Sequence, residues 1–314
     1  MSNGQRPSPA RRARVSKRTY AVRRLVVGAV VMVLLWVSVT VVAGLFGGDT
    51  TRTTEAVAPT TNTFITDGSP TTQPAPTTTE PPPKEATVPS AQDPAEVLIL
   101  GDSDAGTFGP YLKTLLDETG IVTTELDYKT SSGLSRPDFF DWPTHMRQVV
   151  PAVNPDIVIV TFGGNDAQGL RALDLTWVVN YVPGKGGDDA EWRAEYGTRV
   201  GEVMDYLSEG NRTLIWVGIP NDDNPEVTAR MRVQDEVVRA EAAKRPEVVF
   251  IDTWTRFSGR NGGWAEFVVD PRDGIGKDVR AGDGFHLNEN GAQILALDIA
   301  DAVRAELRAR GADI

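Results

Sequence analysis

The sequence predicts an α/β fold built on a central five-stranded parallel sheet. From about Pro94 onward, five short apolar runs rich in Val, Ile and Leu alternate with longer segments whose apolar residues recur at three- and four-residue steps. This alternation is typical of parallel sheets covered by helices, because each parallel connection needs a helical crossover. About 220 residues in five such units can bury one core. We therefore expect one folded domain over residues 94–314.

The predicted elements follow one another along this domain. We expect strands near residues 96–101, 121–127, 156–162, 212–219 and 247–252. We expect helices near residues 108–119, 139–153, 191–209, 226–245 and 289–309. The second helix has one apolar face, and Asn288 is a suitable N-cap for the last helix. Two long loops interrupt the alternation, at residues 174–195 and 258–282. Aromatic residues in the first loop either stack on sugar rings or pack beneath the loop.

The residues before the domain are predicted to include a membrane anchor. Residues 1–24 contain eight basic residues and no acid, and residues 25–46 form a 22-residue run without charge. A helix of that length measures about 33 Å and crosses the hydrocarbon core, with its basic flank in the cytoplasm. We therefore expect a basic cytoplasmic tail, a single-pass signal anchor in the cell membrane and an extracytoplasmic domain. A cleaved signal peptide is the alternative, although its apolar region is usually shorter.

Residues 47–93 are predicted to be a disordered linker. Residues 49–93 hold fourteen Thr and eight Pro, a composition that buries too little apolar surface to fold and that resembles glycosylated stalks. From residue 49 onward the chain carries 24 basic and 43 acidic residues, a net charge of -19, which disfavours a nucleic-acid partner. The sequence contains no cysteine, so disulfides and Cys-based metal sites are excluded.

A serine follows the first predicted strand, in the segment Gly101-Asp102-Ser103-Asp104. Ligands bind at the carboxyl ends of parallel strands, so this turn would present Ser103 to a substrate. A serine nucleophile needs a general base, and the chain has two histidines. His145 falls at the edge of an apolar helix face. His286 lies in a loop before the last helix, and Asp283, three residues earlier, is close enough in sequence to orient its ring.

Four short blocks resemble those of the SGNH (GDSL) hydrolases and occur in the same order. The blocks are Gly101-Asp102-Ser103, the glycine of Ser131-Ser132-Gly133-Leu134-Ser135-Arg136, Gly163-Gly164-Asn165-Asp166 and Asp283-Gly284-Phe285-His286. The resemblance covers roughly residues 94–309, and the run from Arg136 to Pro143 is similar to a poorly characterised bacterial branch. It implies a three-layer α/β/α, flavodoxin-like fold and ester hydrolysis without a cofactor or a metal.

The resemblance implies a role for each matching residue. Ser103 would be the nucleophile, His286 the general base and Asp283 the acid that orients the imidazole. The oxyanion hole would consist of the backbone N–H groups of Ser103 and Gly133 and the side-chain amide of Asn165.

Three further residues near these blocks have expected roles. Asp102 is expected to hold the turn through hydrogen bonds. Asp104 departs from the family, which usually has an apolar residue after the serine, and is a candidate substrate contact. Its carboxylate would favour the protonated form of His286 or repel an anionic substrate, and a position facing solvent is the alternative. Arg136 is a candidate for binding a substrate carboxylate, and a structural ion pair is its alternative role.

The expected function is an extracytoplasmic serine esterase that forms an acyl-enzyme. It would remove or transfer acyl groups, typically acetyl, on cell-envelope carbohydrate or small acyl esters. An O-acyltransferase with the same triad is one alternative. The segment Asp102-Ser103-Asp104 also resembles the start of the haloacid-dehalogenase-like phosphatases, in which an aspartate is the nucleophile and Mg²⁺ is required. A catalytically silent envelope-binding domain is the third alternative.

Overall fold

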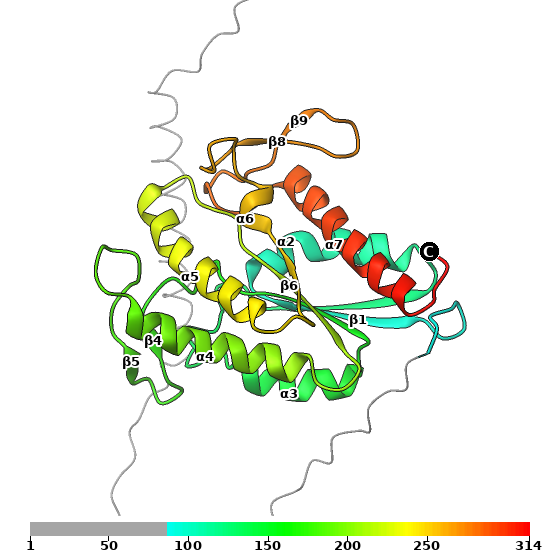
Figure 1. The fold of residues 1–314 in the computed structure, drawn as a ribbon, viewed down its shortest axis with the longest axis horizontal. Coiled ribbons are helices and arrows are strands. Elements are labelled where there is room, and N and C mark those ends of the chain that lie inside the picture. The colour runs from blue at the N-terminus through cyan, green and yellow to red at the C-terminus, as the bar shows by residue number, and fades with distance from the viewer. Residues whose placement is uncertain (1–86) are drawn as a thin grey trace, which may run out of the picture. The chain divides into compact units, whose positions relative to one another are not determined.

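The computed structural model describes residues 87–314 and confirms the five-stranded parallel sheet. Its strands, in spatial order, are β2 (Val122–Tyr128), β1 (Ala95–Gly101), β3 (Ile157–Thr161), β6 (Thr213–Val217) and β7 (Val249–Ile251). Within the sheet, β2 lies on one side of β1, and the chain then crosses over so that β3 lies on the other side (Figure 1). The loops after β1 and β3 diverge at this reversal, which is where ligands bind in open α/β sheets.

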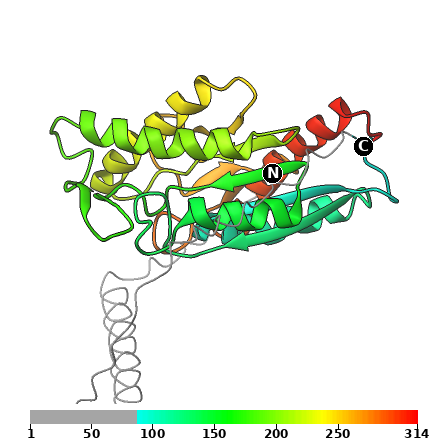
Figure 2. The ribbon, with the colours of Figure 1, turned by 90° about the horizontal axis from the view of Figure 1, so that it is seen from below.

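Helices cover both faces of the sheet, as the three-layer prediction requires. The helices are α2 (Ser103–Asp117) and α7 (Glu289–Ala309) on one face, and α3 (Trp142–Val153), α4 (Ala190–Leu207) and α5 (Pro225–Ala243) on the other (Figure 1). Helices α4 and α5 run side by side (Figure 2). Alternate side chains of β1 point to the two faces, so Ile99 joins the α2–α7 core and Leu100 joins the other. This double burial explains the uninterrupted apolar run.

Two helix starts differ from the sequence prediction, and capping explains both. Helix α2 begins at Ser103 instead of residue 108, because the Asp102 side chain accepts a hydrogen bond from the N–H of Asp104 and caps the helix. Helix α3 begins at Trp142 instead of residue 139, where Asp141 is the N-cap and Pro143 occupies the first turn. The nucleophile candidate is therefore the first residue of a helix, not part of a loop.

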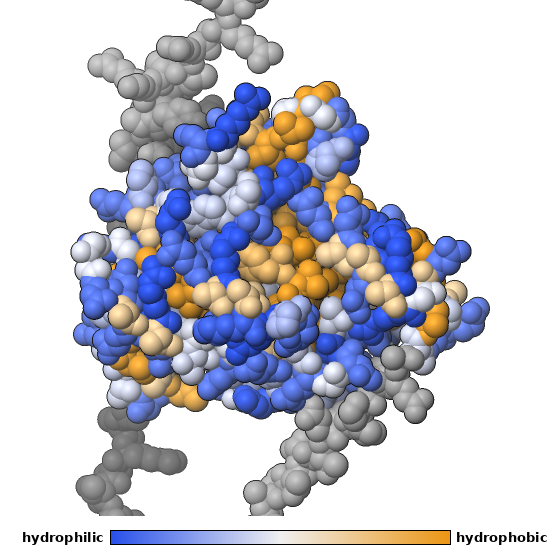
Figure 3. Space-filling view, viewed as in Figure 1, coloured by the Kyte–Doolittle hydropathy of each residue, from blue (hydrophilic) through white to orange (hydrophobic). Residues whose placement is uncertain are grey.

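Short antiparallel hairpins occur at the two predicted loops, and the first hairpin begins just before residue 174, where its loop was predicted to start. One is formed by β4 (Leu170–Arg171) and β5 (Trp177–Val179), and the other by β8 (Phe267–Val269) and β9 (Gly276–Asp278). A four-residue helix, α6 (Thr253–Arg256), precedes the second hairpin. Trp192 and Tyr196 stack on each other in the core, which favours packing over sugar binding for these two aromatic residues. Apolar surface gathers at the β8–β9 end of the molecule (Figure 3), where Phe267 is 59% exposed.

The predicted membrane span at residues 25–46 and most of the predicted linker lie outside the described residues. Within residues 87–314, none of the helices combines the length and the apolar character that a membrane crossing needs.

Candidate active site

The carboxyl ends of β1 and β3 are joined by the carboxylate of Asp102. Its Oδ1 accepts a hydrogen bond from Asp104 N at 2.9 Å, and its Oδ2 accepts from Gly163 N and Gly164 N, both at 3.1 Å. Complete burial, with the nearby charge of Asp166, raises the pKa of Asp102 to about 7. Asp102 therefore fixes the turn that carries Ser103, which is the role that the sequence predicts for it.

Ser103, His286 and Asp283 form one continuous hydrogen-bonded chain. Ser103 Oγ lies 2.9 Å from His286 Nε2, and His286 Nδ1 lies 2.6 Å from Asp283 Oδ2. The other oxygen of Asp283 accepts the N–H groups of Phe285 and His286, both at 3.1 Å. Partial burial favours the protonated carboxyl, but these hydrogen bonds outweigh it and lower the pKa of Asp283. The ionised carboxylate can orient the imidazole and stabilise the imidazolium.

The loop between β2 and α3 brings Gly133 to the same edge of the sheet. The buried carboxylate of Asp166 accepts hydrogen bonds from Leu134 N and Ser135 N, both at 2.9 Å, and from the Tyr196 hydroxyl at 2.8 Å. A Cβ on Gly133 would lie 2.0 Å from Asp166 Oδ1, so this approach requires glycine. Within residues 87–314, no hydrogen bond is found from the backbone N–H of Gly133, so this donor is available to a ligand.

Asn165 and the N–H of Ser103 complete the set of donors. Asn165 Nδ2 donates to Ser132 O at 3.2 Å, which leaves one of its two amide hydrogens for a substrate. Ser132 is held by Trp142, whose Nε1 donates to Ser132 Oγ at 2.8 Å. The N–H of Ser103 is the first of α2 and has no partner within the helix. The structure therefore places Asn165 directly against the loop that contains Gly133.

Asp104 lies in the protein interior, not on the surface that a substrate would meet. It is 6% exposed, and its Oδ2 has no hydrogen-bond partner among the described residues. Burial, reinforced by the charge of Asp102, raises the pKa of Asp104 well above its usual range. This position corrects the expectation that Asp104 contacts substrate.

Arg136 forms a bidentate ion pair inside its own loop. Its Nε and Nη2 donate to the two carboxylate oxygens of Asp138, both at 2.7 Å. The Asp138 side chain is 3% exposed, so this arginine compensates a buried charge. The structural alternative therefore describes Arg136 better than the expected contact with a substrate carboxylate.

Two supporting residues were missed by the sequence analysis. Asp166 follows Asn165 in one of the four blocks, and its acidic side chain after Gly-Gly-Asn was an available signal. Arg280 is buried and donates to the carbonyl oxygens of Asn221, Phe257 and Phe285 at 2.9–3.0 Å. Burial lowers the pKa of Arg280 to about 10. Nothing in the sequence distinguished this arginine, which ties the His286 loop to the loops after β6 and α6.

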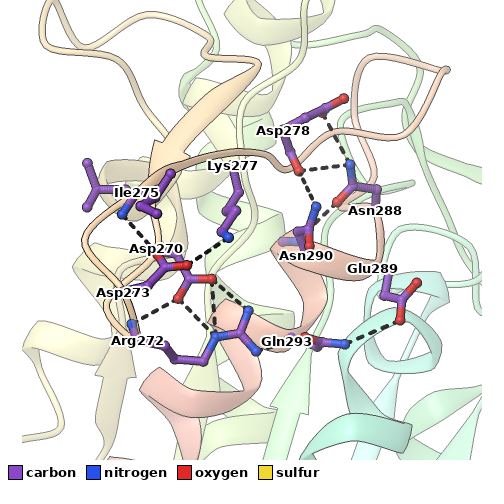
Figure 4. Close-up of polar contacts among 12 residues, drawn as sticks. Asp270, Arg272, Asp273, Ile275, Lys277, Asp278, Asn288, Glu289, Asn290 and Gln293 are labelled. Carbon is purple, nitrogen blue, oxygen red and sulfur yellow. Dashed lines mark hydrogen bonds and ion pairs between the residues drawn. The ribbon is translucent and has the colours of Figure 1, made fainter.

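The β8–β9 hairpin is attached to the start of α7 (Figure 4), the helix that follows His286 in the sequence. Asn288 Nδ2 and Asn290 Nδ2 donate to Asp278 O at 3.1 and 3.0 Å. Arg272 pairs with Asp270 through its guanidinium and also donates to Gln293 Oε1 at 2.8 Å. These contacts fix the start of the helix that follows the candidate base.

Residues 87–314 contain no group of three or more His, Asp or Glu side chains suited to hold a metal ion. The arrangement has the parts that acyl transfer through a serine needs: a nucleophile, a base, an orienting acid and donors for an oxyanion.

Comparisons with known proteins identify relatives of the folded part. No curated protein matches the chain in sequence. A GDSL-like lipase structure from Bacteroides thetaiotaomicron is 15% identical, with 70% of this chain and 92% of that chain covered and a TM-score of 0.46. An acetyl xylan esterase structure from Geobacillus stearothermophilus is 18% identical, with 71% and 97% covered and a TM-score of 0.45. The model of the family described as "Protein of unknown function (DUF459)" matches residues 96–302, more than half of the chain, and the protein therefore belongs to the DUF459 family.

Proposed function

We propose that the protein is an extracytoplasmic serine esterase of the SGNH type. The unbroken chain from Ser103 Oγ through His286 to Asp283 carries this proposal. A serine hydroxyl is a weak nucleophile unless a base accepts its proton, and the base is effective when a third group fixes its tautomer. The substrates are acyl esters, typically acetyl, on cell-envelope carbohydrate or on small molecules. The basic tail and apolar run before the domain support the envelope location.

The reaction proceeds through an acyl-enzyme. His286 Nε2 takes the proton of Ser103 Oγ as the oxygen attacks the ester carbonyl, and the new oxyanion is met by Ser103 N, Gly133 N and Asn165 Nδ2. The imidazolium then gives its proton to the departing alkoxide, which leaves as the alcohol. Water, activated by the same imidazole, attacks the acyl group and releases a carboxylic acid and free Ser103.

Labelling with a fluorophosphonate probe tests the nucleophile. We expect the full-length protein to be labelled, Ser103→Ala to give no adduct and His286→Ala to react far more slowly. His145→Ala is the matched control, because His145 pairs with Asp127 through its Nε2 at 2.6 Å and does not contact Ser103. An unlabelled but folded wild-type protein would reject the esterase and favour the silent binding domain.

Acyl transfer is the second candidate, because it uses the same acyl-enzyme with an alcohol in place of water. Incubating the acetyl-enzyme, with the label on its acetyl group, with envelope glycan separates the two reactions. Labelled free acetate indicates hydrolysis, and labelled acetylated glycan indicates transfer. The aspartate-nucleophile phosphatase is disfavoured, because both oxygens of Asp102 accept backbone hydrogen bonds and the residue is 0% exposed. A chelator would abolish phosphatase activity and leave the serine esterase unaffected.

A further inference from the structure

A hollow of about 270 Å³ opens beside Asn165, between the loop after β3 and helix α5. Asn165 and Gln168 line one side, and Val227, Arg230 and Met231 line the other. Asn165 is one of the donors proposed to meet the ester oxygen. A chemical group in this hollow would therefore lie beside one of the proposed oxyanion donors.

Arg230 brings a positive charge to the hollow, and no carboxylate within residues 87–314 forms an ion pair with it. No ion pair or hydrogen bond joins its side chain to another residue within 87–314, not even to Glu226 one turn earlier on α5. Three other arginines of this acidic domain, Arg136, Arg245 and Arg272, each hold a carboxylate with two guanidinium nitrogens, whereas Arg230 holds none. The charge of Arg230 is thus available to a ligand.

The backbone at Arg230 is fixed by the glycine-rich turn that begins at Pro183. Gly184 adopts φ +73° and packs directly on α5, so that a Cβ there would lie 2.6 Å from Ala229 O and 2.8 Å from Arg230 Cα. Gly184 N in turn donates to the carboxylate of Asp189, the residue before α4. The segment that interrupts the strand–helix alternation therefore supports one wall of the hollow.

We propose that Arg230 binds an anionic group, a carboxylate or a phosphate, carried by the ester substrate beside its reacting carbonyl. This inference rests on the proposed esterase function and names its substrate class. A guanidinium matches the geometry of both anions through paired N–H donors. The flanking Val227 and Met231 side chains and the partial burial of Arg230 limit competition from water. The substrate is then an acylated acidic or phosphorylated sugar, not a neutral one.

A matched set of acetylated sugars tests the proposal in the full-length protein. The substrates are acetylated methyl glucoside, methyl glucuronide and methyl glucoside 6-phosphate, with 4-nitrophenyl acetate as a small neutral ester. We expect kcat/KM to be about tenfold to a hundredfold higher for at least one anionic sugar than for the neutral sugar. Preference for the glucuronide identifies a carboxylate ligand, and preference for the 6-phosphate identifies a phosphate ligand.

The variant Arg230→Met should abolish this preference by raising KM and should leave 4-nitrophenyl acetate hydrolysis unchanged. Arg230→Lys should restore part of the preference. Arg304→Met is the matched control, because Arg304 is a half-buried arginine of α7, fifteen residues beyond the helix start, and pairs with the exposed Asp301. Equal turnover of all three sugars by the wild type, or an equal loss on all substrates in Arg230→Met, would overturn the proposal.

A binding measurement separates this proposal from the esterase function itself. Calorimetry with methyl glucuronide and with inorganic phosphate should detect binding to Ser103→Ala and not to the double variant Ser103→Ala/Arg230→Met. Absence of binding to Ser103→Ala by both anions refutes the anion site even if Ser103 hydrolyses esters. Binding that depends on Arg230 in a protein whose Ser103 forms no acyl adduct keeps the anion site and rejects the esterase.

Discussion

Among single residues, Asn165 gives a test of transition-state stabilisation. Its amide donates to Ser132 O and retains a second hydrogen for charge that develops on the ester oxygen. We expect Asn165→Ala to lower kcat for 4-nitrophenyl acetate by about 10² to 10³ with little change in KM. Single-turnover kinetics measure the acylation step directly. Asn261→Ala, in an exposed loop, is the control. An effect of Asn165→Ala on KM alone would contradict the assigned role.

Asp104 gives a prediction about pH. An acid whose pKa is higher in the folded than in the unfolded state holds its proton more tightly when folded. Its contribution to the free energy of unfolding is therefore favourable at low pH and is lost as pH rises above about 4 towards the folded-state pKa. Burial and the charge of Asp102 raise the pKa of Asp104 in this way.

We accordingly expect Asp104→Asn to increase stability more at pH 8 than at pH 5, because asparagine carries no charge to desolvate. Urea unfolding at the two pH values measures the difference. Asp301→Asn, whose parent side chain is 78% exposed, should show no such dependence. An equal effect of Asp104→Asn at both pH values would mean that Asp104 is ionised in the folded protein.

The residue roles were predictable to different degrees. The serine, the histidine and its acid could be inferred because they stand in short blocks with local geometry: a turn after a strand and a carboxylate three residues before a histidine. Asp104 and Arg136 could not, because burial and ion pairing depend on the packing of distant segments. Arg280 contacts carbonyl groups up to 59 residues away in sequence, a relation that no local pattern encodes.

Among the structural elements, strands and long helices were easier to predict than their ends. Helix α7 begins and ends where its apolar repeat and Asn288 indicate. The start of α2 was missed, because Gly106 looks like a loop residue although it occupies a half-buried position against Tyr128. The short hairpins were missed because two or three paired residues leave no measurable alternation.

The β8–β9 hairpin gives a prediction at this scale. Arg272→Ala removes the pair with Asp270 inside the hairpin loop and the hydrogen bond to Gln293, which joins the hairpin to α7. We expect faster amide hydrogen exchange in residues 276–290 and a lower kcat, with β1 and β3 unchanged in exchange. Arg193→Ala is the control, because it breaks an exposed ion pair with Glu236 that involves neither the hairpin nor α7. If amide exchange in residues 276–290 were the same in Arg272→Ala as in Arg193→Ala, the hairpin would not order the His286 loop.

For the whole molecule, the proposed anchor should determine where the protein is located and should not be needed for the reaction at Ser103. The charge-free run at residues 25–46 should hold the protein in the membrane fraction, and the domain that follows it should be open to protease from outside the cell. Deleting residues 1–46 should move the protein out of the membrane fraction and leave fluorophosphonate labelling of Ser103 unchanged. Protection of the domain from external protease in intact cells, with digestion after lysis, would reverse the predicted orientation.

The pairing of α2 with α7 links catalysis to temperature. Ser103 begins α2, His286 lies just before α7, and the two helices pack together on one face of the sheet. The apolar contacts between them therefore set the distance between the proposed nucleophile and the proposed base. Because a displacement of about 1 Å can cost 10²-fold in rate, we expect slight thermal loosening of this helix pair to stop turnover while the sheet stays intact. The temperature of maximal activity should thus lie below the melting temperature of the domain.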